Sequence, residues 1–125
     1  MPKIYLSPST QDWNMYVTGS GSEEYNMNLL ADALVPYLLS NGIQYQRNRP
    51  EMTAGSSIRE ANQGEYDLYL ALHSNAAPEG RYGEERGIIA FYYPGSVGGQ
   101  RAAELIAQEL RKIYPLPNKV TTRPT

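Results

Sequence analysis

The segment "YDLYLAL", residues 66–72, constrains the fold of this chain more than any other stretch. After Asp67 it is a nearly continuous apolar run of strand length, and it ends in the polar triplet His73-Ser74-Asn75. Runs of this kind are typical of strands that other elements cover on both faces, as in parallel sheets. The segment therefore predicts a central, buried strand.

The segments around it alternate between the two types of secondary structure. Short β-prone runs and longer helical patterns predict strands at 3–6, 43–47, 66–72 and 87–95, and helices at 23–42, 56–64 and 97–114. This order predicts an α/β fold, a three-layer sandwich with a mostly parallel central sheet. No internal repeat or linker divides residues 1–125, so we expect one domain. The β-prone "KVTT" near the end is followed by no further element, so we expect the sandwich to be incomplete at its C-terminal end.

Each long helix has a predicted core-facing side. In the first helix the residues at helical spacing are Leu29, Leu30, Ala33, Leu34, Tyr37 and Leu38. In the last helix they are Ala103, Ile106, Ala107, Leu110 and Ile113.

Composition excludes several functions. The chain has 11 basic and 13 acidic residues, no cysteine and a single histidine. No basic stripe indicates nucleic-acid or membrane-surface binding, and no apolar run is long enough to span a membrane. The absence of cysteine excludes thiolate metal ligands and a cysteine nucleophile. The first residues do not form a secretory signal, so we expect cytoplasmic synthesis.

The candidate site lies where ligands bind in open α/β sheets, outside the carboxyl ends of the strands. The polar loop 7–22 follows the first strand, Glu23 and Glu24 begin the first helix, and His73 follows the central strand. An imidazole and a carboxylate that meet there would suit zinc, which needs three protein ligands in a hydrolytic site. By residue type alone, a single histidine after an apolar strand is more often a hydrogen-bonded residue at the strand end than a metal ligand. Both glutamates are equally well explained as partners of the helix dipole.

Four segments, "KIYLSPSTQDWN", "GSEEYNMNLLADAL", "REANQGEYDLYLALHSNA" and "GIIAFYYPGS", resemble the zinc-dependent N-acetylmuramoyl-L-alanine amidases known as amidase type 3. The resemblance runs from Lys3 to about Tyr114. Its most specific part comprises Ala61, Asn62, Asp67, His73, Asn75 and Ala76.

This resemblance implies a peptidoglycan hydrolase that cleaves the amide between N-acetylmuramic acid and L-alanine of the stem peptide. It implies Zn²⁺ as cofactor, with Glu23 and His73 as two metal ligands and Glu24 as the alternative to Glu23. Asn75 and Trp13 become candidate substrate contacts, with peptidoglycan or muropeptides as partner. Without a signal, such an enzyme would reach the cell wall after release or in a phage or spore context.

Two departures from the family pattern matter. The family's first metal-binding histidine is absent from "SPSTQDWN", which leaves Asp12, Gln11 or Asn14 as the possible third ligand. The resemblance also places the catalytic glutamate beyond residue 125, so we expect little or no turnover from these residues alone. The same absence would leave a sheet edge uncovered, through which a homodimer could form.

Two alternatives remain at this point. One is a catalytically inactive cell-wall-binding domain of the same fold. The other is a flavodoxin-like domain that binds a nucleotide or flavin, which the lack of a glycine-rich phosphate loop disfavours.

Overall fold

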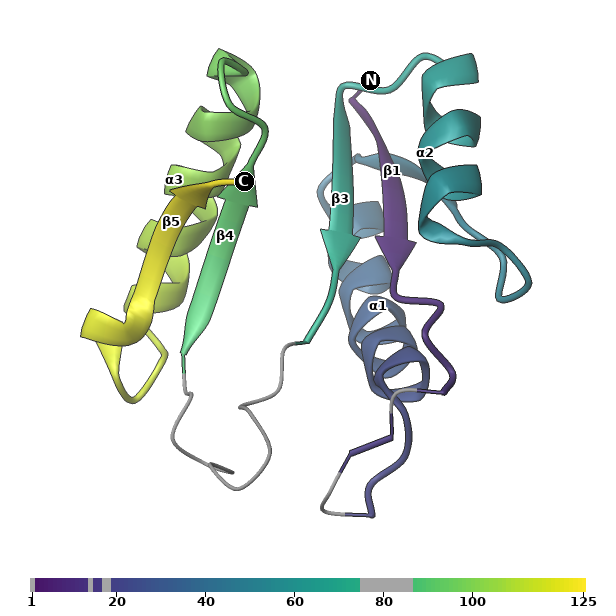
Figure 1. Cartoon of the computed structure of the whole chain (residues 1–125). Helices are drawn as coiled ribbons and strands as arrows, with labels where there is room; N and C mark the ends of the chain where they lie inside the picture. The colour runs from purple at the N-terminus through teal and green to yellow at the C-terminus, as the bar shows by residue number, and fades with distance from the viewer. Residues whose placement is uncertain (1, 14, 17–18, 75–86) are drawn as a thin grey trace. The chain divides into compact units, whose positions relative to one another are not determined.

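The computed structural model describes residues 2–13, 15–16, 19–74 and 87–125. Contacts divide the chain into two compact units, Met1–Asn75 and Ala76–Thr125. We call these unit 1 and unit 2 (Figure 1). The expectation of one domain over residues 1–125 stays a prediction.

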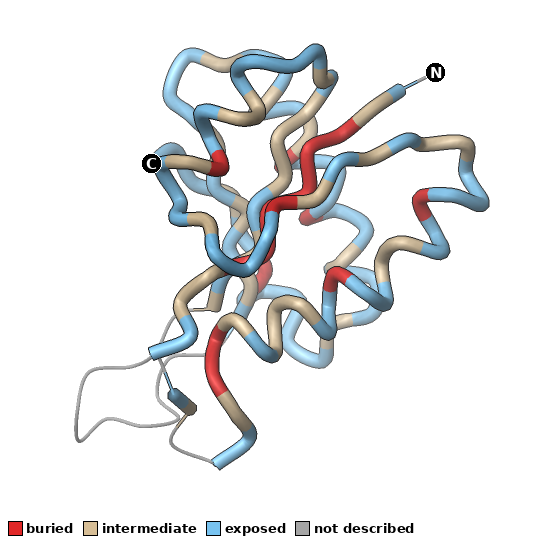
Figure 2. Tube along the Cα trace, turned by 90° about the vertical axis from the view of Figure 1, so that its right-hand side faces the viewer, coloured by how far each residue is buried: buried red, intermediate tan, exposed pale blue. Residues whose placement is uncertain are grey.

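Unit 1 is built on a sheet of three parallel strands. These are β1 (Lys3–Pro8), β2 (Gln44–Arg47) and β3 (Leu68–Leu72), in the order β2-β1-β3. The sheet therefore has β1 at its centre, and residues 4–9 form a continuous buried run that is red in Figure 2. The strand runs two residues further than predicted. The pairing of β1 with β2 ends at Leu6, so Pro8 pairs only with Leu72 of β3. Proline has no backbone N–H, and at this position no hydrogen bond to β2 is lost.

Helices α1 (Glu23–Ser40) and α2 (Ala54–Gln63) cover opposite faces of this sheet. Leu6 is in register with Arg47, whose guanidinium bonds Asp32 of α1 at 2.7 Å. Tyr5 points to the other face, since side chains alternate along a strand, and its hydroxyl donates to Glu60 of α2 at 3.0 Å.

The predicted core face of α1 is partly wrong. Its buried apolar residues are Ala31 and Leu38, whereas Leu29, Leu30 and Tyr37 are 51%, 49% and 70% exposed. Apolar residues occur on every side of this helix, so their spacing does not single out one face.

Tyrosines pack on the α2 side of the sheet. Tyr5 stacks on Tyr69, its register partner in β3, with ring centroids 5.5 Å apart, and meets the edge of Tyr66 at 5.3 Å. Burial and the hydrogen bond to Glu60 raise the pKa of Tyr5 to about 12. Three aromatic rings therefore fill the space between β1, β3 and α2, while the hydroxyl of Tyr69 reaches Ser7 at 2.9 Å.

Unit 2 contains β4 (Ile88–Tyr92), α3 (Val97–Arg111), a short 3-10 turn (Pro117–Lys119) and β5 (Val120–Pro124). The strands β4 and β5 are parallel, and α3 packs along them (Figure 1). Gly87 has φ of 125°, and a Cβ at this position would lie 2.3 Å from the Lys119 carbonyl oxygen. Only glycine allows the two strands to begin side by side.

The α/β fold with parallel strand pairing is confirmed. In the last helix, Ala103 and Ala107 are buried as predicted, whereas Ile106 is 37% and Ile113 is 78% exposed. The prediction is wrong for Ile113 because α3 ends at Arg111, three residues earlier than expected. In the described part of the chain, no helix combines the length and apolar character that a membrane crossing requires.

Candidate functional site

A buried carboxylate and the only histidine meet at the carboxyl edge of the unit 1 sheet. Glu23 is the first residue of α1, and His73 directly follows β3. The distance between His73 Nδ1 and Glu23 Oε2 is 3.2 Å. The Glu23 side chain is 2% exposed and that of His73 is 46% exposed. The structure thus brings together the two residues that the sequence predicts as metal ligands.

Serines from two strand ends hold the same carboxylate. The hydroxyl of Ser9, which follows β1, donates to Glu23 Oε2. The N–H and hydroxyl of Ser74 lie 3.4 and 3.3 Å from Oε1. A buried carboxylate is costly unless hydrogen bonds replace its water, and here donors from the ends of β1 and β3 supply them.

The N-terminal turn of α1 fixes the position of Glu23, the first residue of the helix. Ser22 caps the helix by accepting from the Tyr25 N–H at 3.0 Å, which fixes the first turn. Glu23 then lies in the first turn of α1, at the positive end of the helix dipole. Glu24 is only half-buried, and its backbone N–H donates to the Gln11 carbonyl at 3.3 Å.

The other predicted ligands lie in the loop after β1. Asp12 and Gln11 line the same pocket as His73, with Asp12 exposed. Asn14 and the candidate substrate contact Asn75 fall outside the described residues. Across the described ranges, no group of three or more His, Cys, Asp or Glu residues is placed to hold a metal ion. The third ligand therefore stays a prediction.

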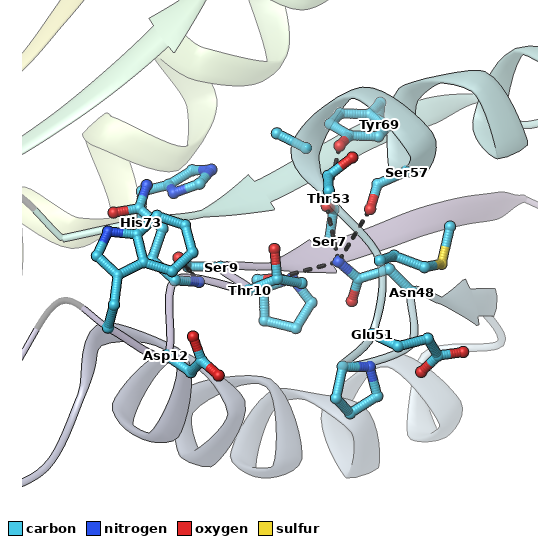
Figure 3. Close-up of a pocket in the computed structure, with 16 residues that line it drawn as sticks. Ser7, Ser9, Thr10, Asp12, Asn48, Glu51, Thr53, Ser57, Tyr69 and His73 are labelled. Carbon is cyan, nitrogen blue, oxygen red and sulfur yellow. Dashed lines mark hydrogen bonds between the residues drawn. The ribbon is translucent and has the colours of Figure 1, made fainter.

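The pocket beside His73 has a volume of about 380 Å³. Trp13 lines it and is 73% exposed, which is compatible with its predicted role as a substrate contact. The pocket lies along the ends of β1 and β2 and the first turn of α2, as Figure 3 shows through Ser7, Asn48 and Thr53.

Asn48 forms the buried base of this pocket. Its amide nitrogen is within 3.2 Å of Ser7 Oγ, 3.1 Å of the Pro8 carbonyl oxygen and 3.2 Å of Ser57 Oγ. The sequence alone does not single out Asn48 or Ser9, because small polar residues between strands and helices look like ordinary turn residues. Ser57 lies within α2, where a serine carries no distinctive signal.

The acidic residue on the far rim, Glu51, is already paired. Arg49 Nε lies 2.8 Å from Glu51 Oε1, and Arg49 also bonds Glu60 at 3.1 Å. The pKa of Glu51 is lowered by a hydrogen bond from its own backbone and by Arg49, whose guanidinium is shared with Glu60.

No protein-family model and no curated protein matches this sequence. Among solved structures, it is similar to the N-acetylmuramoyl-L-alanine amidase AmiC2 of Nostoc punctiforme, with a TM-score of 0.77 and 13% identity. The match covers 99% of this chain and 69% of that chain. The fold is amidase-like. At this identity the likeness establishes the arrangement of the backbone, and the chemistry has to be argued from the residues of this chain.

Proposed function

We propose that this chain is the catalytic domain of a peptidoglycan hydrolase that cleaves the amide between N-acetylmuramic acid and L-alanine. The observation that carries the proposal is the contact between Glu23 and His73 at 3.2 Å, at the edge where α/β sheets bind ligands. The amidase-like fold supports it, since the solved structure with this fold is itself an N-acetylmuramoyl-L-alanine amidase.

The donor chemistry at this edge suits zinc in part. Carboxylate oxygen and imidazole nitrogen are both zinc ligands, and Glu23 and His73 supply one of each. We propose that these two residues hold Zn²⁺, with the third ligand coming from Asp12, Gln11 or Asn14. When bound, zinc polarises the amide carbonyl and lowers the pKa of its water toward neutrality.

The surrounding residues orient these ligands. Ser9 and Ser74 bond different oxygens of Glu23, so the carboxylate cannot rotate without losing at least one bond. Glu23 in turn lies against His73 Nδ1, and a hydrogen bond there selects the tautomer of the ring. Ser9 and Ser74 are therefore positioning residues, which hold the carboxylate of Glu23 in place beside His73 before Zn²⁺ binds.

The test is cleavage of muropeptides by the full-length protein with zinc, read as release of peptides that begin with L-alanine. We expect Glu23→Gln and His73→Ala to reduce the rate at least about 100-fold, as for the loss of groups that orient or bind a catalytic metal. The matched control is Glu24→Gln, which removes the neighbouring carboxylate of the same helix turn and should leave the rate within about twofold, an effect below 0.5 kcal/mol in the barrier.

Wild-type cleavage by either the Glu23 or the His73 variant would contradict the proposal. Binding of muropeptides without any cleavage or zinc would instead favour the alternative of an inactive cell-wall-binding domain. The Glu24→Gln control shows whether the loss of activity in Glu23→Gln comes from that particular carboxylate or from the loss of any negative charge at the start of α1.

A further inference from the structure

Both oxygens of the Glu23 carboxylate accept from a serine hydroxyl, and each of these serines is bonded in turn by the loop between β1 and α1. The Ser9 hydroxyl donates to Oε2, and Ser9 Oγ accepts from the Gln11 N–H at 3.2 Å. The Ser74 hydroxyl donates to Oε1 at 3.3 Å, and Ser74 Oγ lies 2.6 Å from the hydroxyl oxygen of Tyr16. The loop therefore reaches the same carboxylate by two routes, one through each oxygen.

The number of protons sets the direction of the bond between Tyr16 and Ser74. A serine hydroxyl carries one proton, and that of Ser74 is donated to Glu23 Oε1. Ser74 Oγ can then only accept from a second partner, so the Tyr16 hydroxyl is the donor. Hydrogen bonds in a chain polarise one another, so the bond from Tyr16 strengthens the bond from Ser74 to Glu23.

The backbone of Tyr16 is bonded to residues just before α1. Its N–H donates to the Gly21 carbonyl at 2.8 Å, and its carbonyl accepts from the Gly19 N–H at 3.1 Å. The preceding residue, Met15, pairs with Ser22 in an antiparallel bridge. These bonds fix the position of Tyr16 relative to the start of the helix, while its hydroxyl reaches a residue 58 positions later in the chain, at the end of β3.

The two routes differ in the group that the loop supplies. Gln11 contributes a backbone N–H, whereas Tyr16 contributes a side-chain hydroxyl that a single substitution removes. Tyr16 is half-buried, and the described residues that line the pocket beside His73 do not include it. Its effect on the site therefore passes through Ser74 and not through contact with a ligand in the pocket.

We propose that Tyr16 is a positioning residue for the pair formed by Glu23 and His73. This inference rests on the proposed function and names a further residue on which its site depends. The Tyr16 hydroxyl holds the Ser74 hydroxyl, which holds Oε1 of Glu23, and Oε2 then lies 3.2 Å from His73 Nδ1. Without the tyrosine hydroxyl, the donor to Oε1 is weakened and the carboxylate is less firmly held against rotation.

The single histidine reports on this pair in the absence of metal. The two ring nitrogen resonances of His73 would be recorded by NMR in the zinc-free chain, in mildly alkaline solution so that protonation of the ring does not obscure the tautomer. A hydrogen bond from Nδ1–H to Glu23 favours one tautomer, which keeps the two resonances far apart. We expect Tyr16→Phe, which removes one oxygen and keeps the ring, to bring the two resonances closer together.

A control and a double variant show whether this effect passes through Ser74. The matched control is Tyr25→Phe, which removes another tyrosine hydroxyl near the start of α1 and should leave both resonances unchanged. Tyr16→Phe combined with Ser74→Ala should show no change beyond that of Ser74→Ala alone, since residues in one hydrogen-bond network are not additive. Unchanged resonances in Tyr16→Phe, equal changes in Tyr16→Phe and Tyr25→Phe, or a further change in the double variant would each overturn the inference.

Zinc affinity provides a second measurement, made by competition with a chelator. Tyr16→Phe should weaken Zn²⁺ binding about fivefold, as expected for the loss of one hydrogen bond. Tyr25→Phe should leave the affinity within about twofold of the wild-type value. A loss of stability alone would not change the affinity of the folded chain, so equal zinc affinities of the wild-type chain and Tyr16→Phe would overturn the inference.

This inference and the proposed function fail in different ways. A wild-type chain that neither binds zinc nor cleaves muropeptides would remove the proposed function, and the zinc-free resonances of His73 would still decide the role of Tyr16. Zinc-dependent cleavage that requires Glu23, with unchanged resonances and zinc affinity in Tyr16→Phe, would retain the proposed function and remove the role of Tyr16.

Discussion

The two units have interiors of opposite character. In the described residues, every buried polar or charged side chain belongs to unit 1, and these are Ser7, Ser9, Ser22, Glu23, Asn48 and Ser57. The buried residues of unit 2 are the apolar Ala103, Ala107 and Val120. Polar groups are costly to bury and are retained where they are fully hydrogen-bonded or functional.

This difference shows where the buried polar side chains of the described residues are concentrated. In unit 1 the buried polar groups gather at one end of the sheet, around Glu23 and Asn48, rather than being scattered through it. The far end of the same sheet is closed by ordinary structural bonds, such as the Lys3 N–H to Asp67 at 2.8 Å. Unit 2 contains a two-stranded sheet and one helix, and its buried residues in the described part of the chain are all apolar.

The largest expected effect comes from removing apolar core in unit 1, where polar residues leave few such side chains. Leu6→Ala, at a fully buried position of β1, should lower the free energy of unfolding by about 2–5 kcal/mol. Val120→Ala in unit 2 deletes fewer atoms and should cost about 1–2 kcal/mol. Urea unfolding of both variants measures the difference, and a smaller loss for Leu6→Ala than for Val120→Ala would break the comparison.

The second prediction concerns pH and the tyrosine stack of unit 1. The pKa of Tyr5 is raised from 10.0 to about 12, chiefly by burial. Between these values the unfolded state loses the Tyr5 proton while the folded state keeps it, so the free energy of unfolding falls as pH rises. Below pH 10 this contribution does not vary. Tyr5→Phe should show a shallower fall between pH 10 and 12, measured by urea unfolding at each pH, and identical slopes would exclude Tyr5 as the cause.

The third prediction compares the helix caps of the two units. Thr53 caps α2 through Ser56, and Ser96 caps α3 by accepting from the Gly99 N–H at 3.0 Å. Replacing either by alanine should cost about 1 kcal/mol of stability. Thr53 also lines the pocket beside His73, so only Thr53→Ala should slow muropeptide cleavage. Equal effects of the two variants on cleavage would show that the caps act through stability alone.

The smallest effect is expected for the ion pair between α1 and β2. Arg47 bonds Asp32 at 2.7 Å, but the Asp32 side chain is 63% exposed. Asp32→Asn should therefore cost less than about 1 kcal/mol. Arg47→Met should cost more, since Arg47 also donates to the side-chain and backbone oxygens of Asn28 at 2.7 and 3.2 Å. Thermal melts in low and high salt would check both, and a larger loss for Asp32→Asn would contradict this ranking.

The helices and strands could be predicted because apolar spacing and capping residues are properties of short stretches of sequence. The apolar run before His73, the Ser22 cap and the Ser96 cap each mark a boundary that the structure retains. The prediction failed for the buried face of α1, where apolar residues surround the helix. It also failed for the start of α2, which begins at Ala54, two residues before the predicted start, because Thr53 forms a capping box with Ser56.

In the candidate site, too, some residues could be predicted from the sequence and others could not. Glu23 and His73 have chemically distinctive side chains at element boundaries, so their place in the chain predicts that they meet. Ser9 and Asn48 contribute through tertiary bonds to partners far away in the sequence, such as Asn48 to Ser7. Nothing local distinguishes them from turn residues, and only the register of β1, β2 and β3 brings them to the pocket.

The most direct test of the central claim uses the single histidine as its own probe. The imidazole nitrogen resonances of His73 would be followed by NMR as Zn²⁺ is added to the wild-type chain and to Glu23→Gln. If Glu23 and His73 hold the metal together, the wild-type signals shift and saturate at one zinc per chain, while those of Glu23→Gln require far more zinc. Resonances that stay unchanged in the wild-type chain, or that shift identically in both proteins, would contradict a metal site built on this pair.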